Sequence, residues 1–445
     1  MKRILVIVLS LVIVLSLAAC QPSGSSAPAA GDGGGSTPAP EGGGATLTYL
    51  ACSENFPDAF KDFVAEYEAT TGNKVDVQLY PAVEFDQMIR ARVMSGQPFD
   101  IMRHDSVRMS ELMWPNEWAE PLNDRPWVDR LDPGVKDMIT WSNGTLAALP
   151  IYNVGGMGMM YNKRIFEDAG VTKLPETWAE FLDLCETLKN YGVTPVNIQL
   201  ASGSEFGTTH LMHNLYVNIA ATRGVDGAKK LIEELDTNQT KYVDVPEFVT
   251  SLYQMLELRD KGYINEDFIT TTFEKSQENF GTGVVAMHPC GDFILGPLAD
   301  YDIDIQNDIG FFPVPYMDTP GMICTATEVG LGVYSGSEQK DLAFEFMDMY
   351  ASKEVQTKYM ESFPGVATFA DVPHESNPIA EAIQSYGAEG QAFNGIFEQL
   401  KAWPEMENRG IIQEMFLGAL TPEQVLEKVQ AQAEIIAKSK GLEGW

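Results

Sequence analysis

Segments with strand-like and helix-like spacing of apolar residues alternate along the chain from Thr46 onward. The stretch LTYL predicts a strand, and the apolar residues after it recur at helical spacing up to Gly72, a typical stop signal. In KVDVQLY the apolar residues are Val75, Val77 and Leu79, which is the alternation of a strand. Such βαβ alternation predicts an α/β fold with parallel sheets covered by helices on both faces. Ligands of these folds bind beyond the carboxyl ends of strands, so the loops after strands are the places to search.

Two further helices have recognisable ends. One runs through Met88 and is closed by Gly96, after which FDIM predicts the next strand. The other begins at Thr177 and Glu180, which have the spacing of a capping box, and it carries Trp178 on its apolar side. These signals extend the alternation of strands and helices through much of the chain.

The first residues have the pattern of an export signal. Lys2 and Arg3 precede an almost wholly aliphatic run at 4–17, which is shorter than the ~20 residues needed to span a bilayer. The tetrapeptide Leu17-Ala18-Ala19-Cys20 is similar to the lipobox of bacterial lipoproteins, in which the cysteine is lipidated and begins the mature chain. A plain secretory signal with an incidental cysteine is the alternative. We expect residues 1–19 to be a signal peptide and Cys20 to be a lipid anchor.

The residues that follow are a predicted linker. Residues 20–45 are nearly all Gly, Ser, Pro and Ala after the cysteine, so they have too few apolar side chains to offset the entropy of ordering. The globular body begins near Thr46 and comprises about 400 residues. One hydrophobic core seldom organises so long a chain, and we therefore expect two domains.

The charge of the chain excludes one class of partner. Its formal net charge is -33, and a surface of that sign repels phosphate backbones, so we expect no nucleic acid to bind. We attribute the acidity to solubility in an exposed, salty setting rather than to a specific cationic partner.

Four of the five cysteines lie in the body of the chain. They are scattered and show neither a CxxC pair nor a metal-type spacing, so they do not form a disulfide framework. They are Cys52, Cys185, Cys290 and Cys324. A bridge between Cys290 and Cys324 is conceivable outside a cell, but we expect buried free thiols.

A set of motifs in fixed order carries a resemblance to a known family. From Gly144 the chain has a strand ending in Leu149-Pro150, a second strand ending in Tyr161-Asn162-Lys163, and the helix start Pro175-Glu176-Thr177-Trp178. The later stretches FGTGVVAMHPCGDF and IGFFPVP fit the same pattern. This order resembles that of the extracellular solute-binding proteins, the maltose and oligosaccharide receptors of ABC importers. The resemblance covers essentially the whole chain after Ala45.

The resemblance implies a two-lobed α/β structure, the type II fold of periplasmic binding proteins, with the ligand in a cleft between the lobes. It places chain crossings near 152–158, 327–331 and 386–390. Gly155, Gly156 and Gly158 would let the first crossing absorb the dihedral changes of a hinge, although close backbone contact in a strand would explain them too. The implied lobes are 46–155 with 332–385, and 156–331 with 386–445.

A sugar needs polar side chains for its hydroxyls and flat rings for its C–H faces. By resemblance, the first-lobe candidates that follow strands are Glu54, Asn55, Arg103 and Asp105. Related maltose receptors carry a similar His-Asp pair and use the Asp on sugar hydroxyls. Asp105 could instead cap a helix that begins near Ser106. Arg103 could orient Asp105, meet an acidic sugar or form a surface ion pair.

The remaining candidates lie at the first crossing and in the second lobe. Tyr152 and Asn153 enter the crossing, where Tyr152 could equally pack the hinge. SGSEFGTTH falls where relatives place a carboxylate and aromatics, although a plain loop before a helix fits it as well. Phe293 replaces the Trp usual in relatives, so either its stacking is weaker, or the sugar differs, or it belongs to the core. The second-lobe candidates are Glu205, Phe206, Asp292, Phe293 and Trp403.

Catalysis and metal binding have little support in the sequence. GSEFG is not a Gly-x-Ser-x-Gly elbow, because its Ser directly follows the Gly. His210 and His213 lie on a predicted helix without a His-Glu-x-x-His motif, so we expect core or surface histidines rather than metal ligands. DYDIDIQND lacks the Gly and Glu of a calcium loop. We expect no cofactor and no metal.

These observations favour a monomeric, lipid-anchored receptor on the outer face of a bacterial cell membrane. It would bind a carbohydrate, in particular an oligosaccharide, close over it and deliver it to the permease of an ABC importer. Two alternatives remain open: a surface enzyme acting on glycosides, which would need two facing carboxylates, and a receptor of the same fold for a polyamine or a peptide.

Overall fold

The structure, a computed structural model, describes residues 44–445 except 53–55, 57, 105–117, 133–134, 137–138, 142, 152–154, 326–329 and 363–366. The described residues belong to one compact unit, Gly43–Trp445. The expected signal peptide, Cys20 and nearly all of the linker lie outside the described residues.

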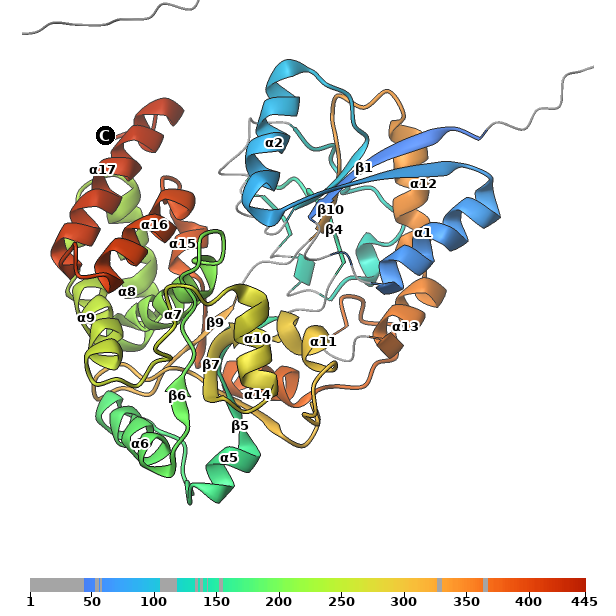
Figure 1. The fold of residues 1–445 in the computed structure, drawn as a ribbon. Coiled ribbons are helices and arrows are strands. Elements are labelled where there is room, and N and C mark those ends of the chain that lie inside the picture. The colour runs from blue at the N-terminus through green and yellow to red at the C-terminus, as the bar shows by residue number, and fades with distance from the viewer. Residues whose placement is uncertain are drawn as a thin grey trace, which may run out of the picture. The chain divides into compact units, whose positions relative to one another are not determined.

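The first of two sheets has five strands in the order β2-β1-β3-β10-β4 (Figure 1). β1 is parallel to β2 and β3, as the sequence predicts, whereas β10 is antiparallel to β3 and β4. The strands are β1 (Thr46–Cys52), β2 (Lys74–Tyr80), β3 (Ile101–His104), β4 (Leu149–Pro150) and β10 (Gly330–Val333). The helices packed with this sheet are α1 (Asp58–Thr71), α2 (Ala82–Ser95) and α12 (Lys340–Tyr350), and α13 (Lys353–Ser362) packs on α1 and α12.

The second sheet has six strands, in the order β11-β9-β5-β7-β6, with β8 pairing on β5. β5 is antiparallel to β7, β8 and β9, so this sheet is mixed rather than parallel as the sequence predicted. The strands are β5 (Gly156–Asn162), β6 (Thr194–Val196), β7 (Val285–Gly291), β8 (Ile309–Phe312), β9 (Ile323–Thr325) and β11 (Ala392–Asn394). Each mixed sheet arises because a strand enters its lobe from the other one, in the direction opposite to its neighbours.

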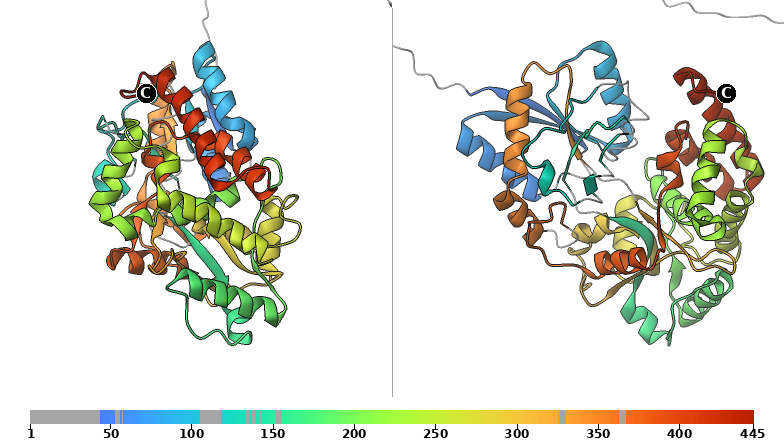
Figure 2. Two further views of the ribbon diagram at one scale, coloured as in Figure 1. Left: turned by 90° about the vertical axis from the view of Figure 1, so that its left-hand side faces the viewer. Right: turned by 180° about the vertical axis from the view of Figure 1, so that it is seen from behind.

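Helices surround the second sheet, and α16 and α17 pack with α7 and α9, which come much earlier in the chain (Figure 2). The longer helices are α6 (Trp178–Tyr191), α7 (Phe206–Tyr216), α8 (Ile219–Asp236), α9 (Pro246–Asp260), α10 (Phe273–Gly281), α14 (Pro378–Ala388), α16 (Glu405–Phe416) and α17 (Pro422–Lys440). The shorter ones are α5 (Lys163–Asp168), α11 (Leu295–Leu298), α15 (Ile396–Gln399) and the 3-10 turns η2 (Val128–Arg130), η3 (Tyr242–Asp244) and η4 (Asp292–Ile294).

Aromatic residues at helical spacing dock α1 on α12. Phe60, Phe63 and Tyr67 are buried along one side of α1. The ring centroid of Phe63 lies 5.0 Å from those of both Phe346 and Tyr350, and the rings meet edge to face. Aromatic pairs of this geometry contribute stabilising free energy in addition to that from the apolar area they bury. The spacing that predicted this helix therefore also determines which helix it packs against.

The predicted helix ends are confirmed. The Thr177 side chain accepts a hydrogen bond from the Glu180 amide, and the Glu180 side chain bonds the amide of Thr177, which completes the capping box of α6. Gly96 closes α2 in the left-handed conformation, with φ of 65°.

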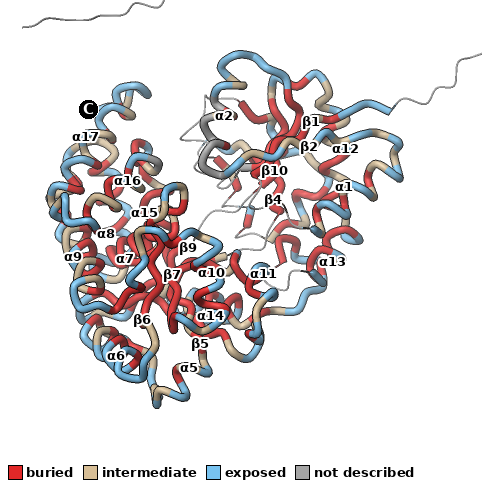
Figure 3. The backbone as a smooth tube through the Cα atoms, viewed as in Figure 1, coloured by how far each residue is buried: buried red, intermediate tan, exposed pale blue. Residues whose placement is uncertain are grey.

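Each lobe has its own hydrophobic interior (Figure 3). The core around the first sheet includes Leu47, Ile101, Leu331 and Phe346. Around the second sheet, one core includes Met159, Phe248 and Leu426, and another includes Met160, Ile309 and Ile379. The two expected domains are therefore two separately packed lobes, as β-strand pairing also indicates.

The chain passes between the lobes at three places. The first passage lies between β4 and β5 and the second between β9 and β10, close to the expected positions. The third lies between Val372, which is in the first-lobe core, and Ile379, which is in a second-lobe core, and so it comes earlier than the expected 386–390. The expected boundaries therefore change: residues 378–385 lie in the second lobe, because the apolar side of α14 packs on β8, and β10 belongs to the first lobe from Gly330.

Gly156 and Gly158, which were candidates for the hinge, lie inside β5. A side chain at Gly156 would collide with Ile323, and one at Gly158 with Phe311. Close packing in a strand, the alternative that the sequence left open, accounts for both glycines.

The assignment of α14 to the second lobe predicts the effect of I379A. Ile379 is fully buried, so the truncation should cost about 2–5 kcal/mol of stability and leave a cavity beside β8. Hydrogen exchange should accelerate in β8 and β9 but stay unchanged in α12. The control I435A changes an isoleucine that is 62% exposed and should alter neither region. Equal acceleration in α12 would contradict the assignment.

Candidate functional site

Five of the predicted ligand residues, namely Glu54, Asn55, Asp105, Tyr152 and Asn153, lie outside the described residues. Arg103 is described and is fully buried in β3, opposite Leu331 of β10. A guanidinium without solvent exposure is neither a surface ion pair nor open to a ligand. The expectation that Arg103 contacts the ligand is therefore corrected: it is an interior residue of the first lobe.

In the second lobe four rings lie in contact in what we call the aromatic row: Phe273, Phe206, His210 and Phe293. The centroid of Phe206 lies 4.9 Å from that of Phe273 and 5.8 Å from that of His210. The centroid of His210 lies 5.6 Å from that of Phe293. None of the four is buried, and Phe293 is 46% exposed. The row is therefore a partly exposed surface of ring faces and edges, drawn from α10, α7 and η4.

A hydrogen bond between two helix starts brings Phe206 and Phe273 together. The backbone amide of Phe273, the first residue of α10, donates to Ser204 Oγ at 3.0 Å, just before α7. Thr272 caps α10 by accepting from the amide of Lys275. Both helices thus begin at one place, although their first residues are far apart in the sequence.

Glu205 lies at the head of α7 beside the row. Its Oε2 accepts a hydrogen bond of 2.8 Å from the amide of Gly203, within the turn that leads into the helix. A carboxylate is also favourable at a helix N-terminus. One carboxylate oxygen of Glu205 is therefore already used in a hydrogen bond within its own turn. The Glu205 residue is partly exposed.

Asp292 and Phe293 follow the carboxyl end of β7, where the sequence placed a ligand site. A side chain at Gly155 would collide with Asp292 Oδ1, so the carboxyl group lies directly against the first passage between the lobes. Desolvation raises the pKa of Asp292 to about 7, although backbone amides of Asp292 and Phe293 oppose the shift. Phe293 lies over Gly291, where a Cβ would come within 2.5 Å of Phe293 Cε1. Glycines at 155 and 291 thus make room for two predicted site residues.

Trp403 is a core residue. Its side chain is 6% exposed, and its ring lies 5.7 Å from Tyr242 and 6.3 Å from Tyr216 between centroids. Its Nε1 donates to Glu405 Oε2 at 2.9 Å. Because no ring face is open, the expectation that Trp403 stacks on a ligand is corrected.

Sequence reasoning missed three members of this neighbourhood: Phe273, His210 and Arg409. The guanidinium carbon of Arg409, on α16, lies 5.7 Å from the centroid of Phe206, and its Nε lies 3.3 Å from Glu405 Oε1. Phe206 and His210 are one helical turn apart, which the sequence could have shown. Phe273 and Arg409 come from distant segments, and no local signal points to them.

The three histidines of this lobe are kept neutral. Desolvation lowers the pKa of His210 to about 3, with His213 and Arg409 contributing. It also lowers the pKa of His288 to about 3, and that of His213 well below its ordinary value. The ring of His213 stacks on Phe397 at 3.6 Å, so His213 is a core histidine, as expected.

Within the described residues no cluster of His, Cys, Asp or Glu side chains is arranged to hold a metal ion. The four body cysteines are buried and free, which confirms the expected thiols. None of the helices in the described part of the chain combines the length and apolarity needed to cross a membrane.

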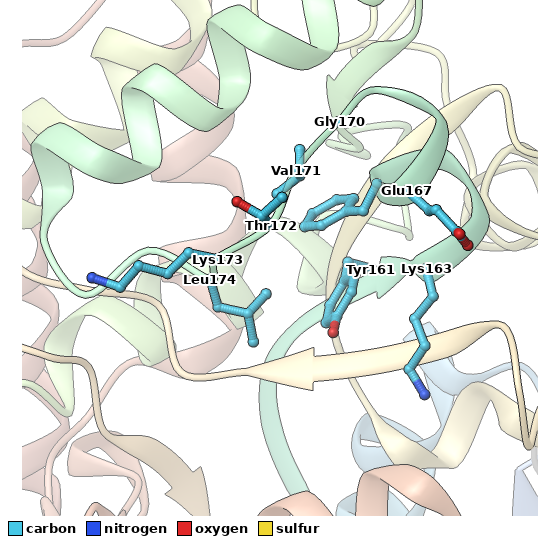
Figure 4. A pocket seen from close by; sticks show the side chains of 9 residues that line it. Tyr161, Lys163, Glu167, Gly170, Val171, Thr172, Lys173 and Leu174 are labelled. Carbon is cyan, nitrogen blue, oxygen red and sulfur yellow. The ribbon is translucent and has the colours of Figure 1, made fainter.

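A separate hollow of about 300 Å³ is lined in part by Tyr161 and Lys163 (Figure 4). Tyr161 is near the end of β5, whereas Gly155 precedes its start. The rings of Tyr161 and Phe166, whose centroids are 4.4 Å apart, are among the groups that line it. The other residues that line it are Glu167, Gly170, Val171, Thr172, Lys173 and Leu174. None of the predicted site residues lines this hollow, so it is distinct from the aromatic row.

The chain has two lobes joined by three passages, and polar and aromatic groups lie beside the first passage. This is the architecture of a two-lobed binding protein. Residues 53–357 match the family described as bacterial extracellular solute-binding protein, and the chain belongs to that family. The multiple sugar-binding protein of Streptococcus mutans is 21% identical over 318 residues, which are 71% of this chain and 73% of the relative.

Solved structures share the two-lobed fold. A chitin oligosaccharide binding protein superposes with a TM-score of 0.74 at 24% identity, over 89% of this chain and 100% of the other. The solute-binding protein RafE in complex with raffinose gives a TM-score of 0.73 at 18% identity, over 88% and 99% of the two chains. The fold expected from the sequence is thus confirmed.

The position of Asp292 predicts a pH effect on stability. Its pKa is raised from 3.8 to about 7, so between these values the folded protein holds a proton that the unfolded chain has lost. The stability that Asp292 contributes is therefore complete at low pH and is lost as the pH rises through about 7. D292N should match the wild type near pH 4 and become the more stable protein by pH 8, measured by urea unfolding.

The control for this comparison is D226N, a change at an exposed aspartate on α8. Its difference from the wild type should not vary between pH 4 and 8. A D292N curve that runs parallel to the wild type would show that the carboxyl group is solvated in the folded protein.

Proposed function

We propose that this chain is a receptor that binds a carbohydrate, in particular an oligosaccharide, between its two lobes. The observation that carries the proposal is the aromatic row, a partly exposed set of rings at the carboxyl end of β7 and beside the first passage between the lobes. Flat rings suit the C–H faces of sugars, and sites in α/β folds lie beyond strand ends. We include Phe206, Phe293, Glu205 and Asp292 in the site, together with Glu54, Asn55, Asp105, Tyr152 and Asn153.

The printed names of similar proteins support a sugar as the cargo. The Streptococcus mutans relative is named for multiple sugars, and the two solved structures are named for chitin oligosaccharide and raffinose. Oligosaccharides offer several rings in succession, which matches a row longer than one ring.

We propose delivery to an ABC importer, which the family and the two lobes support. A ligand that contacts both lobes only when they are closed shifts the population toward the closed form. We propose that a permease then recognises the paired lobes. In this scheme Cys20 carries the lipid and residues 20–45 act as a leash at the outer face of the cell membrane, and the receptor works as a monomer.

We propose binding without hydrolysis. A glycosidase needs two carboxyl groups free to act on the sugar bond. Beside the aromatic row, one Glu205 oxygen holds the amide of Gly203, and Asp292 is packed against Gly155. These engagements support a binding role for both side chains.

The experiment is thermal unfolding of residues 43–445 with raffinose and chitotetraose, and with spermidine and a tripeptide as controls. A ligand of the folded state at one hundred times its Kd stabilises by ~2.7 kcal/mol, which raises the midpoint. A rise with a sugar that is recovered intact supports the proposal. A rise with spermidine or the tripeptide alone, or hydrolysis of the sugar, contradicts it.

The variant F293A tests the site. Removal of the most exposed ring of the row should abolish the sugar-dependent rise and leave the sugar-free midpoint almost unchanged, because Phe293 is 46% exposed. The matched control is Y253A, which removes an aromatic ring that is 49% exposed on α9. Y253A should keep the full response, and an equal response in F293A would exclude Phe293 from the site.

A further inference from the structure

His210 occupies the middle of the aromatic row. It lies one helical turn after Phe206 on α7 and reaches Phe293 at the end of β7. Its ring meets Phe206 at 65° and Phe293 at 70°, so it stands edge-on to both neighbours. A polar ring, rather than another apolar one, therefore lies between Phe206 and Phe293.

One ring nitrogen of His210 remains for a ligand. Nδ1 is buried and accepts or donates no hydrogen bond among the described residues, whereas Nε2 is not buried. An imidazole kept neutral carries one donor and one acceptor nitrogen. Because Nδ1 is enclosed, Nε2 is the ring nitrogen that a ligand can reach.

The guanidinium that lies over the row is already paired. Arg409 lies over Phe206, but its Nε contacts Glu405 Oε1 at 3.3 Å in the next turn of α16. His213 on α7 and His288 on β7 interact electrostatically with His210. Glu205 and Asp292 are the neighbours in the chain of Phe206 and Phe293, the two rings that His210 contacts. The row itself therefore consists of three phenylalanine rings and one neutral hydrogen-bonding ring, with the carboxyl groups of Glu205 and Asp292 beside it.

We infer that His210 is a specificity-determining residue, which hydrogen-bonds through Nε2 to a hydroxyl of an uncharged oligosaccharide whose rings lie on Phe206 and Phe293. This inference rests on the proposed function. A row made only of phenylalanine would accept any flat apolar ligand, whereas the histidine at its centre requires a hydroxyl at one position. A site built to hydrogen-bond a hydroxyl rejects analogues that lack it.

The test is H210F, which keeps an aromatic ring at the centre and removes the hydrogen bond. It should weaken binding of raffinose or chitotetraose, whichever the wild type binds more tightly, by roughly three- to tenfold in calorimetry. H210Q places an amide nitrogen near the position of Nε2 and should recover most of the affinity. The control H374F changes an exposed histidine and should have no effect.

The pH dependence distinguishes a neutral from a titrating histidine. Because the pKa of His210 is about 3, the ratio of wild-type to H210F affinity should stay constant from pH 5.5 to 8. Use of the ratio removes the contribution of Asp292, which both proteins share.

Three outcomes overturn the inference. H210F binding as tightly as the wild type, while F293A has lost binding, rejects the role of His210 and leaves the proposed function standing. A ratio that changes near pH 6.5 shows that His210 titrates. Absence of any sugar response in the wild type rejects both proposals together.

Discussion

The candidate site depends on a close contact between the end of β7 and the first passage between the lobes. Asp292 can lie there only because residue 155 has no side chain. Its carboxyl group is thereby desolvated, and the next residue, Phe293, is turned over Gly291 and into solvent. A larger residue at 155 would displace η4, and the exposed end of the aromatic row would move with it. The glycines therefore position aromatic surface at the segment that joins the two lobes.

The other rings of the row are positioned by contacts within the second lobe between residues that are far apart in the sequence. Ser204 fixes the start of α10 to the start of α7, and α16 places Arg409 over Phe206. Rings held on helices lose little freedom when a ligand arrives, so more of the contact energy remains for binding. The rings of the row are thus positioned by packing within the second lobe, and neighbouring rings meet at interplanar angles of 57° to 70°.

Local signals in the sequence predicted much of the fold and only part of the site. The capping box at Thr177, the strand pattern of β2 and the family motifs all act over a few residues, and they were confirmed. The third passage was misplaced, because the apolar side of α14 would suit either lobe and only its packing on β8 decides. Trp403 and Arg103 were assigned to the site because sequence order cannot show burial. Phe273 joins the row through a contact with Ser204, which no local pattern encodes.

The chemistry of the row argues against a cationic cargo despite a net charge of -33. A polyamine would need free carboxylate oxygens, whereas one oxygen of Glu205 bonds the amide of Gly203 and desolvation raises the pKa of Asp292 to about 7, which lowers the negative charge beside the row. An acidic cargo would need a free cation, and the guanidinium over Phe206 is paired with Glu405. Phosphate esters are disfavoured for the same reason. Among the described residues, the row offers ring surface and a neutral imidazole beside these two engaged carboxyl groups, a combination that suits a ligand with many hydroxyls and no charge. Under the proposed function, recognition depends on shape and hydrogen bonding rather than on the net charge of -33.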